Sequence, residues 1–314
     1  MTPGSFGDTL AARVGERQSQ IVLGLDPDPG ALWPGVEGSR GDGDAAVAGW
    51  ASSPAQGRAA CAVQAHCRAL IDAAGPACVA VKPQLACFER LGAVGRHALE
   101  GVVRHAREAG LLVIADGKRG DIDVTARAYA QALFGGVQTP FGEIAGLGAD
   151  MATVNPLMGT DAVEPFVTAA RASHGGVLVL VRTSNPGASD VEDLPVAGGG
   201  AVWERLAELV DELGRSGVGE SSLSDVGAVV GATAPGHLER ARELMPHAVF
   251  LLPGVGAQGG RVEDLRAAFA PGRAGGLVAA SRSIADAHTT TGGDPAEAAR
   301  SEAERLRASA WELA

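Results

Sequence analysis

The strongest constraint on the fold is an alternation that runs along the chain. Short apolar runs rich in β-forming residues are each followed by a longer segment with the spacing of an amphipathic helix. The predicted strands are 20–26, 78–83, 111–116, 150–155, 176–183, 226–232, 248–253 and 276–281. The predicted helices are 59–74, 95–109, 122–133, 162–173, 200–214, 235–244, 262–269 and 295–310. Eight strand-then-helix units in 314 residues favour an α/β fold, a single (β/α)8 barrel domain over residues 1–314.

The composition excludes several classes of partner. The chain has 26 Lys and Arg against 37 Asp and Glu, a formal net charge of −11, and no run of basic residues. This charge predicts no binding to nucleic acid or to an anionic membrane. The longest apolar runs have the length of strands, and residues 1–10 do not have the pattern of a secretion signal. We therefore expect a cytoplasmic protein.

No sequence pattern predicts a metal site. The four cysteines, Cys61, Cys67, Cys78 and Cys87, have no CxxC spacing, and the histidines form neither an HxH nor an HExxH pattern. We expect the cysteines to be buried thiols.

Two predicted loops are longer than the usual connection between a strand and a helix. Residues 27–58 are rich in Gly, Asp, Ser and Pro, and residues 184–199 are rich in Gly, Asp and Pro. Each loop follows a strand, so each is expected at the carboxyl end of the barrel, where such barrels keep their active sites. We interpret both loops as walls or lids of a site rather than as linkers.

The two lysines of the chain both lie at the ends of predicted strands on that face. All other basic residues are arginines, so lysine occurs only as Lys82 and Lys118. Lysine differs from arginine in having a compact ammonium that can give up its proton. Both positions are therefore candidates for chemistry.

The sharpest local signal is the sequence Asp-Gly-Lys-Arg-Gly-Asp from Asp116 to Asp121. Side chains two apart on a strand point the same way, so Asp116 and Lys118 should both face the barrel mouth. Asp121 is predicted to open the next helix and to share one face of it with Thr125. Two flanking carboxylates favour the charged amine, which predicts a general acid rather than a Schiff-base lysine. A salt-bridged strand end with a capping aspartate is the alternative that involves no catalysis.

A glycine-rich segment, 253–260, follows the seventh predicted strand. It contains GxGxxG, but its place after that strand does not fit a dinucleotide-binding fold, and an arginine stands where such a fold carries an acid. Loops after the last two barrel strands commonly bind phosphate through backbone amides. Tight turns alone are the alternative. The predicted phosphate-monoester site consists of Gly254, Gly256, Gln258, Gly259 and Arg282.

Polar residues also end other predicted strands. They are Asp26, Asn155, Thr183 and Ser184. Each of them can stabilise a turn through its own side chain. Together they predict a pocket for a ligand rich in hydroxyls and carbonyls.

Taken in order, these motifs resemble orotidine 5′-phosphate decarboxylase in its longer bacterial branch. The likeness runs from about residue 20 to residue 284 and is most specific in the Asp-x-Lys-x-x-Asp element and the two phosphate motifs. The matching segments are GLDPDP at 24–29, VKPQ at 81–84, DGKRGDI at 116–122, VNPLMG at 154–159, RTSNP at 182–186, PGVGAQGG at 253–260 and SRSI at 281–284.

The resemblance implies a cofactor-free enzyme that converts orotidine 5′-phosphate to UMP and CO₂ in pyrimidine synthesis. It implies that Asp116, Lys118 and Asp121 are catalytic. Asp121 and Thr125 would act across a homodimer interface, in the neighbouring subunit's site. The substrate-binding residues implied are Asp26 and Lys82 for the ribose hydroxyls, Ser184 for the pyrimidine, Gln258 and Arg282 for the phosphate, and Asn155 in the same polar pocket.

The sequence departs from the family's shorter branch at two places and leaves two other functions open. Gly117 and Ser281 stand where that branch has a bulkier residue and a glycine, and the loop at 27–58 has no counterpart. One alternative is a metal-assisted sugar-phosphate decarboxylase of the same kind of barrel. The other is a barrel that binds a nucleotide without catalysis.

Overall fold

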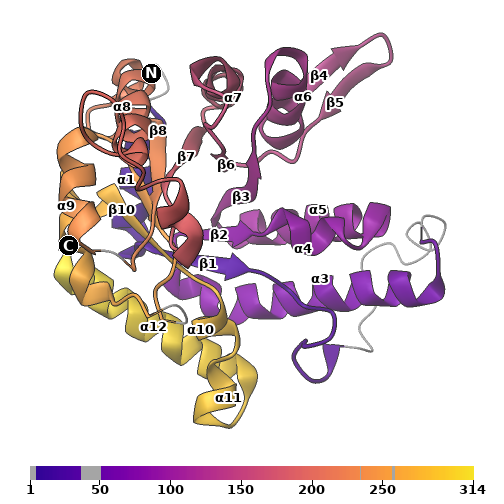
Figure 1. The fold of residues 1–314 in the computed structure, drawn as a ribbon. Coiled ribbons are helices and arrows are strands. Elements are labelled where there is room, and N and C mark those ends of the chain that lie inside the picture. The colour runs from indigo at the N-terminus through magenta and orange to yellow at the C-terminus, as the bar shows by residue number, and fades with distance from the viewer. Residues whose placement is uncertain (1–4, 37–50, 234, 257–258) are drawn as a thin grey trace.

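The computed structural model describes residues 5–36, 51–233, 235–256 and 259–314. In this part of the chain, eight parallel strands close into a barrel in the order β1-β2-β3-β6-β7-β8-β9-β10, with β10 hydrogen-bonded to β1. They are β1 (Ile21–Leu25), β2 (Ala80–Pro83), β3 (Leu112–Arg119), β6 (Met151–Val154), β7 (Gly176–Arg182), β8 (Val226–Val230), β9 (Phe250–Leu252) and β10 (Gly276–Ala280). The predicted (β/α)8 barrel is confirmed (Figure 1).

Helices form the outer layer. The α-helices are α1 (Phe6–Arg17), α3 (Pro54–Ala74), α4 (Leu85–Glu89), α5 (Gly92–Glu108), α6 (Asp123–Leu133), α7 (Thr160–Ala172), α8 (Val202–Gly214), α9 (Pro235–Leu244), α10 (Arg282–Ala285), α11 (Ala287–Thr291) and α12 (Pro295–Leu313). The 3₁₀ helices are η2 (Gly75–Ala77), η3 (Pro186–Asp190), η4 (Arg215–Gly217), η5 (Val262–Phe269) and η6 (Arg273–Gly275).

The strands are buried on both faces because they separate two apolar layers. Ile21 and Leu23 of β1 belong to the layer under the helices, whereas Val22 belongs to the core inside the barrel. Phe6 and Leu10 of α1 join that inner core, so α1 packs against the amino ends of the strands. This double burial explains why the strands appear in the sequence as continuous apolar runs.

The elements that the sequence did not predict include α1 and a two-stranded hairpin. α1 precedes the first strand, where Ser5 and Asp8 form a capping box that fixes its start. A hairpin of β4 (Gly136–Thr139) and β5 (Gly142–Ala145) lies between α6 and β6. Its two strands pair only with each other, and Figure 1 shows the hairpin projecting beside α6. The hairpin lacks the continuous apolar run of the barrel strands, so its sequence predicts a connection and no strand.

Three predicted boundaries need correction. α3 begins at Pro54, earlier than the predicted helix, because Ser53 caps it by accepting a hydrogen bond from the Gln56 N–H. The first long loop, predicted at 27–58, therefore ends before Pro54. Its residues 37–50 lie outside the described part of the chain. The predicted helix 262–269 is a 3₁₀ helix, η5. In the second long loop, 184–199, residues Pro186–Asp190 form η3.

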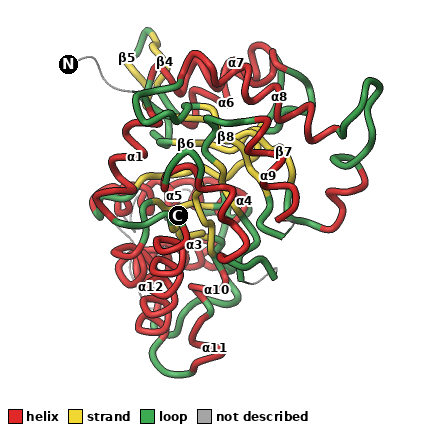
Figure 2. The backbone as a smooth tube through the Cα atoms, turned by 90° about the vertical axis from the view of Figure 1, so that its left-hand side faces the viewer, coloured by secondary structure: helices red, strands yellow, loops and turns green. Residues whose placement is uncertain are grey.

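The exposed large apolar side chains lie in the segments that follow three neighbouring strands of the barrel. Within the described ranges, all of them follow β3, β6 or β7. Figure 2 shows α6, α7 and the hairpin side by side there. We call this set the apolar rim: Ile122, Val124, Tyr129, Val137, Phe141, Ile144, Leu157, Met158, Val191 and Leu194.

Among the described helices, none has both the length and the apolar character that a membrane crossing needs.

Candidate active site

Asp116 is the centre of a buried cluster of charges at the carboxyl end of β3. Its Oδ2 lies 2.5 Å from Nζ of Lys82 on β2, and its Oδ1 lies 2.5 Å from Nζ of Lys118. The Asp116 side chain is 7% exposed and that of Lys82 is 9% exposed, whereas that of Lys118 is 45% exposed. We call these three residues the lysine–aspartate cluster. The structure thus places the two lysines of the chain on the two oxygens of one carboxylate, with the Lys118 ammonium facing the open side.

Two uncharged residues that the sequence analysis did not single out complete the surroundings of Asp116. Thr153 on β6 donates from Oγ1 to Asp116 Oδ1 over 2.9 Å, and Gln84 donates from Nε2 to Oδ2 over 3.3 Å. Gln84 stands in the VKPQ motif, directly after Pro83, so its position carried a signal. Thr153 lies inside an apolar strand run, where nothing in the sequence marks it as a functional residue.

The electrostatics of the cluster favour its ionised form. Burial raises the pKa of Asp116, but the Lys82 and Lys118 ammonium groups and their hydrogen bonds outweigh it and lower the pKa to about 2. Burial lowers the pKa of Lys82, but the charges of Asp116 and Asp26 and the hydrogen bond to Asp116 outweigh it, so the net pKa is raised. At neutral pH the carboxylate is therefore charged and the buried Lys82 stays an ammonium.

Asp121 does not lie where the sequence predicted. α6 begins at Asp123, so Asp121 lies outside the helix and cannot share a helix face with Thr125. The Asp121 Oδ1 instead accepts a hydrogen bond from the Ile122 N–H over 2.8 Å, which holds the turn that leads into α6. Among the described residues, no ion pair joins Asp121 to Lys118, so within this chain Lys118 has one carboxylate partner, not two.

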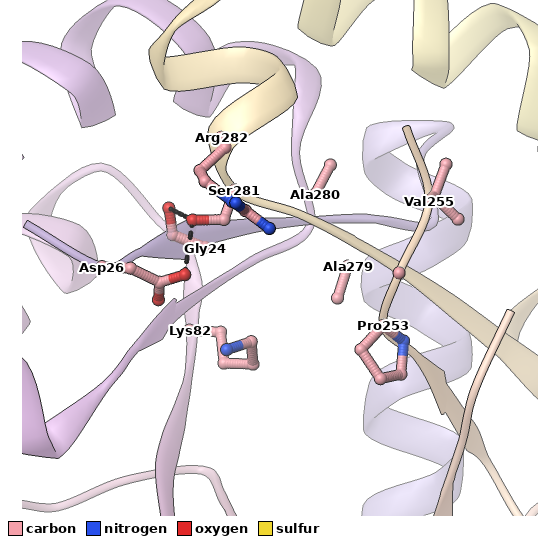
Figure 3. Close-up of a pocket in the computed structure, with 10 residues that line it drawn as sticks. Gly24, Asp26, Lys82, Pro253, Val255, Ala279, Ala280, Ser281 and Arg282 are labelled. Atoms are coloured by element: carbon pink, nitrogen blue, oxygen red, sulfur yellow. Dashed lines mark hydrogen bonds between the residues drawn. The ribbon is translucent and has the colours of Figure 1, made fainter. Parts of the chain in front are cut away.

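A pocket of about 110 Å³ lies where the first and last strands of the barrel meet. Asp26 follows β1, Lys82 comes from β2, and Arg282 begins α10 (Figure 3). Ser281 Oγ donates to Asp26 Oδ2 over 2.7 Å across this junction. We call it the arginine pocket; its lining is Gly24, Asp26, Lys82, Pro253, Gly254, Val255, Ala279, Ala280, Ser281 and Arg282.

Lys82 connects the arginine pocket to the lysine–aspartate cluster. It lines the pocket and also bonds Asp116. The guanidinium of Arg282 is exposed and makes no ion pair with any residue that the structure describes. It is thus available to an anion in the pocket. Gly24 permits the close approach of the strand ends, because a Cβ there would lie 2.6 Å from the Cβ of Ser281.

The glycine-rich turn after β9 has backbone angles that favour glycine. Gly254, Gly256 and Gly259 have φ values of 101°, 75° and 88°. The turn closes on itself, since the Gly256 N–H donates a hydrogen bond to the Gly260 carbonyl over 2.9 Å. Gly254 lines the arginine pocket, whereas the predicted Gln258 lies outside the described residues.

Two other predicted residues have local structural roles. Asn155 Oδ1 accepts a hydrogen bond from the Leu157 N–H over 3.0 Å, so this side chain stabilises the turn after β6. The backbone carbonyl of Ser184, just after β7, accepts a hydrogen bond from Thr233 Oγ1 over 3.3 Å. Neither residue lines the arginine pocket, and Thr125 is exposed on the first turn of α6.

Part of the first long loop supports Arg282. Trp33 donates its indole N–H to the carbonyl of Ala285, the last residue of α10, over 2.8 Å. The Trp33 backbone N–H donates to Nδ1 of the buried His66 on α3 over 3.2 Å. The loop therefore ties α10, which carries Arg282, to the outer helix layer, a connection that the sequence did not indicate.

Within the described ranges, no group of three or more His, Cys, Asp or Glu side chains is placed to hold a metal ion. Both oxygens of Asp116 are already bonded to ammonium groups. The positive charge beside Asp116 is therefore supplied by the two lysine side chains.

Comparison with known proteins gives one consistent result. The family model of orotidine 5′-phosphate decarboxylase / HUMPS matches residues 19–301. An orotidine 5′-phosphate decarboxylase of Rhodopirellula baltica is 41% identical over 288 residues, covering 90% of this chain and 89% of the relative. One of Deinococcus radiodurans is 39% identical over 300 residues, covering 95% of each.

Solved structures agree with the sequence relatives. The structure of Leishmania donovani OMP decarboxylase has a TM-score of 0.67 and 30% identity, and the match covers 98% of this chain and 99% of that one. A Streptomyces avermitilis structure has a TM-score of 0.75 and 30% identity, with 100% and 97% covered. With its barrel, its ordered motifs and relatives of about 40% identity over most of its length, this chain belongs to the orotidine 5′-phosphate decarboxylase family.

Proposed function

We propose that this chain decarboxylates orotidine 5′-phosphate to UMP and CO₂ without a cofactor, and that Lys118 delivers the proton. Its relatives bear the name of this decarboxylase, which makes the chain a carboxy-lyase of pyrimidine biosynthesis. The observation that carries the lysine mechanism is the Lys118 ammonium on Asp116, 45% exposed at the barrel mouth and connected through Lys82 to the arginine pocket.

The substrate is anchored by its phosphate in the arginine pocket. Arg282 supplies a fixed positive charge. Gly254 and Val255, at the start of the glycine-rich turn, line the pocket beside it. Asp26 and Lys82 line the same pocket and bind the ribose hydroxyls. The pyrimidine then reaches Lys118, with Ser184 and Asn155 at neighbouring strand ends. We also assign the predicted phosphate-binding role to Gln258.

The reaction uses charges that are in place before it begins. The bond between C6 and the carboxylate carbon breaks, CO₂ leaves, and the electron pair stays on C6. The Lys118 ammonium stabilises this pair and then transfers a proton to C6, and the neutral amine recovers its proton from water. Preorganised groups that meet developing charge are usually the largest catalytic term. Asp116 holds the ammonium in place and disfavours the substrate carboxylate beside it, which adds ground-state strain.

Two chains share each active site. Among the described residues of one chain, Lys118 has no second carboxylate partner, and Asp121 and Thr125 lie at the surface beside the apolar rim. A patch of exposed apolar side chains of this kind marks an interaction surface. We therefore assign Asp121 and Thr125 to the active site of the partner in a homodimer. In the proposed dimer, both residues lie next to Lys118 of the partner subunit.

Replacing Lys118 by alanine tests the proton donor. We expect turnover in an ultraviolet assay of orotidine 5′-phosphate to fall almost to nothing, while the melting temperature changes little because the side chain is half exposed. Residual activity within tenfold of the unmodified protein contradicts the donor role.

Subunit exchange tests the shared site. Inactive Asp121→Ala and Lys118→Ala chains, once mixed, form hybrid dimers in which one of the two sites has both residues. We expect partial recovery of activity. If mass spectrometry confirms that hybrids form and activity does not return, each site is complete within one chain.

The two other functions make different predictions. A metal-assisted sugar-phosphate decarboxylase needs a divalent ion on free carboxylates, so its activity disappears after exhaustive chelation, whereas decarboxylation of orotidine 5′-phosphate by this chain is expected to survive it. A non-catalytic barrel binds UMP and leaves orotidine 5′-phosphate unchanged.

We also propose a cytoplasmic location. Cys67 and Cys78 are buried free thiols, and burial raises the pKa of each well above the ordinary thiol value. Thiols kept free in this way fit a reducing compartment. Fluorescence microscopy of the tagged chain tests the location.

A further inference from the structure

The strand that carries Asp116 and Lys118 is irregular at just those residues. β3 pairs with β6 through Ala115 and Ala152, and again through Arg119 and Val154. Between these pairs, the three residues 116–118 of β3 stand opposite the single residue Thr153 of β6. This bulge bends the strand and re-aims its side chains, as bulges beside active sites do.

The bulge removes Lys118 from the regular ladder of hydrogen bonds. Lys118 has a φ of +46°, a region that a non-glycine residue rarely adopts. Its N–H donates to Oγ1 of Thr153 over 2.9 Å, so a side chain replaces the lost backbone partner. Without that hydroxyl, a partly buried N–H would have no partner in the observed conformation.

The same hydroxyl also fixes Asp116. Thr153 Oγ1 donates its proton to Asp116 Oδ1 over 2.9 Å, and that oxygen is the one that Lys118 Nζ contacts. Thr153 is 1% exposed, so water does not substitute for it. One hydroxyl thus acts as acceptor for the backbone of Lys118 and as donor to the carboxylate that holds its ammonium.

We propose that Thr153 is a positioning residue that sets where the Lys118 ammonium stands. It holds the Lys118 backbone, from which the side chain starts, and it holds Asp116, which binds the ammonium at the other end of that side chain. Thr153 does not line the arginine pocket, so it acts on the reacting end of the site and not on the phosphate anchor. The proposal rests on the proposed function, because it concerns the proton donor of that reaction.

The test compares Thr153→Val, which keeps the shape and removes the hydroxyl, with Thr153→Ser, which keeps the hydroxyl. A displacement of a catalytic group by about 1 Å costs on the order of 100-fold. We expect Thr153→Val to lower kcat roughly 10- to 100-fold, with KM and the affinity for UMP within about twofold of the unmodified protein. Thr153→Ser should keep kcat within about threefold, since its Oγ can make both bonds.

Ser224 provides a matched control at the other end of the barrel. It is 2% exposed, donates to the Gly214 carbonyl over 2.9 Å and accepts from the Val226 N–H over 3.0 Å. Ser224→Ala therefore removes an equivalent pair of buried bonds. We expect it to lower the melting temperature as Thr153→Val does, without changing kcat.

The outcomes separate the two proposals. If the unmodified protein does not consume orotidine 5′-phosphate, the proposed function is wrong, and this role falls with it. If the unmodified protein is active and Thr153→Val keeps its kcat, or if Ser224→Ala lowers kcat as much, the positioning role alone is overturned. Should Thr153→Val fail to fold, Thr153→Ala removes the same hydroxyl, and the same split between kcat and KM is expected of it.

Discussion

Replacement of Asp116 by asparagine should destabilise the protein in a way that depends on pH with a recognisable sign. The change keeps the shape of the side chain and removes its charge, so the buried ammonium of Lys82, 2.5 Å away, loses its partner. Removing one member of a buried ion pair typically costs about 3–5 kcal/mol. We expect a loss of that size in the free energy of unfolding at pH 7.

The acid side of the profile follows from the pKa of Asp116. A carboxyl whose pKa falls from 3.8 to about 2 on folding contributes about 2–3 kcal/mol at neutral pH. Because the folded pKa is the lower one, this contribution is complete above about pH 4 and is lost as the pH falls through 2. The asparagine variant lacks this part of the acid dependence.

At alkaline pH, the change of stability with pH has opposite signs in the unmodified protein and in the Asp116→Asn variant. In the unmodified protein the pKa of Lys82 is raised, so its contribution is present below the ordinary lysine pKa of 10.5 and is lost at higher pH. In the variant, burial acts on Lys82 with Asp116 gone, and we expect its pKa to fall below 10.5. The unfolded state then binds more protons, and stability rises as the pH increases toward that value.

Urea unfolding at pH values from 3 to 10.5, followed by circular dichroism, measures both effects. Asp225→Asn is the matched control, because Asp225 is equally buried and bonds Arg171 over 2.6 Å at the opposite end of the barrel. Arginine does not lose its proton in this range, so this variant should not regain stability at alkaline pH. A loss below 1 kcal/mol for Asp116→Asn, or the same alkaline profile for both variants, would refute the reasoning.

Two further predictions concern the phosphate end of the site. Arg282→Ala should raise KM for orotidine 5′-phosphate at least tenfold, because a charge-assisted hydrogen bond is worth about 1.5–3 kcal/mol; steady-state kinetics tests this, and an unchanged KM contradicts the assignment. Trp33→Phe removes the 2.8 Å bond to the Ala285 carbonyl, worth about 1 kcal/mol. It should raise KM a few-fold and leave the kcat of saturated enzyme unchanged, and a fall in kcat alone would show that the loop acts on the chemistry instead.

Much of the site could be predicted because parallel strands all end at the same rim. Asp26, Lys82, Asp116 and Lys118 each stand at a strand end in the sequence, and the barrel brings the last three into one cluster and the first two into one pocket. That inference needs only the strand order and the alternation of side chains. The fold followed from a different pattern, the alternation of strand-like and helix-like segments along the chain.

What could not be predicted depends on contacts between elements. The bulge opposite Thr153 is a property of two paired strands, and neither strand's sequence encodes it alone. α6 begins later than predicted, at Asp123, because the carboxylate of Asp121 accepts a hydrogen bond from the Ile122 N–H and holds a turn there. The β4–β5 hairpin is exposed along its length, so it lacks the continuous apolar run by which the barrel strands are predicted.

The pairing of β1 with β10 has a consequence for how the protein is made. Asp26 and Ser281, which bond across the arginine pocket, are 255 positions apart in the chain. During synthesis the first strand leaves the ribosome long before the last one exists. A nascent chain therefore has only half of the surface that we propose anchors the nucleotide. Nucleotide can therefore stabilise only finished molecules. Truncation before residue 282 abolishes that protection however well the remaining strands assemble.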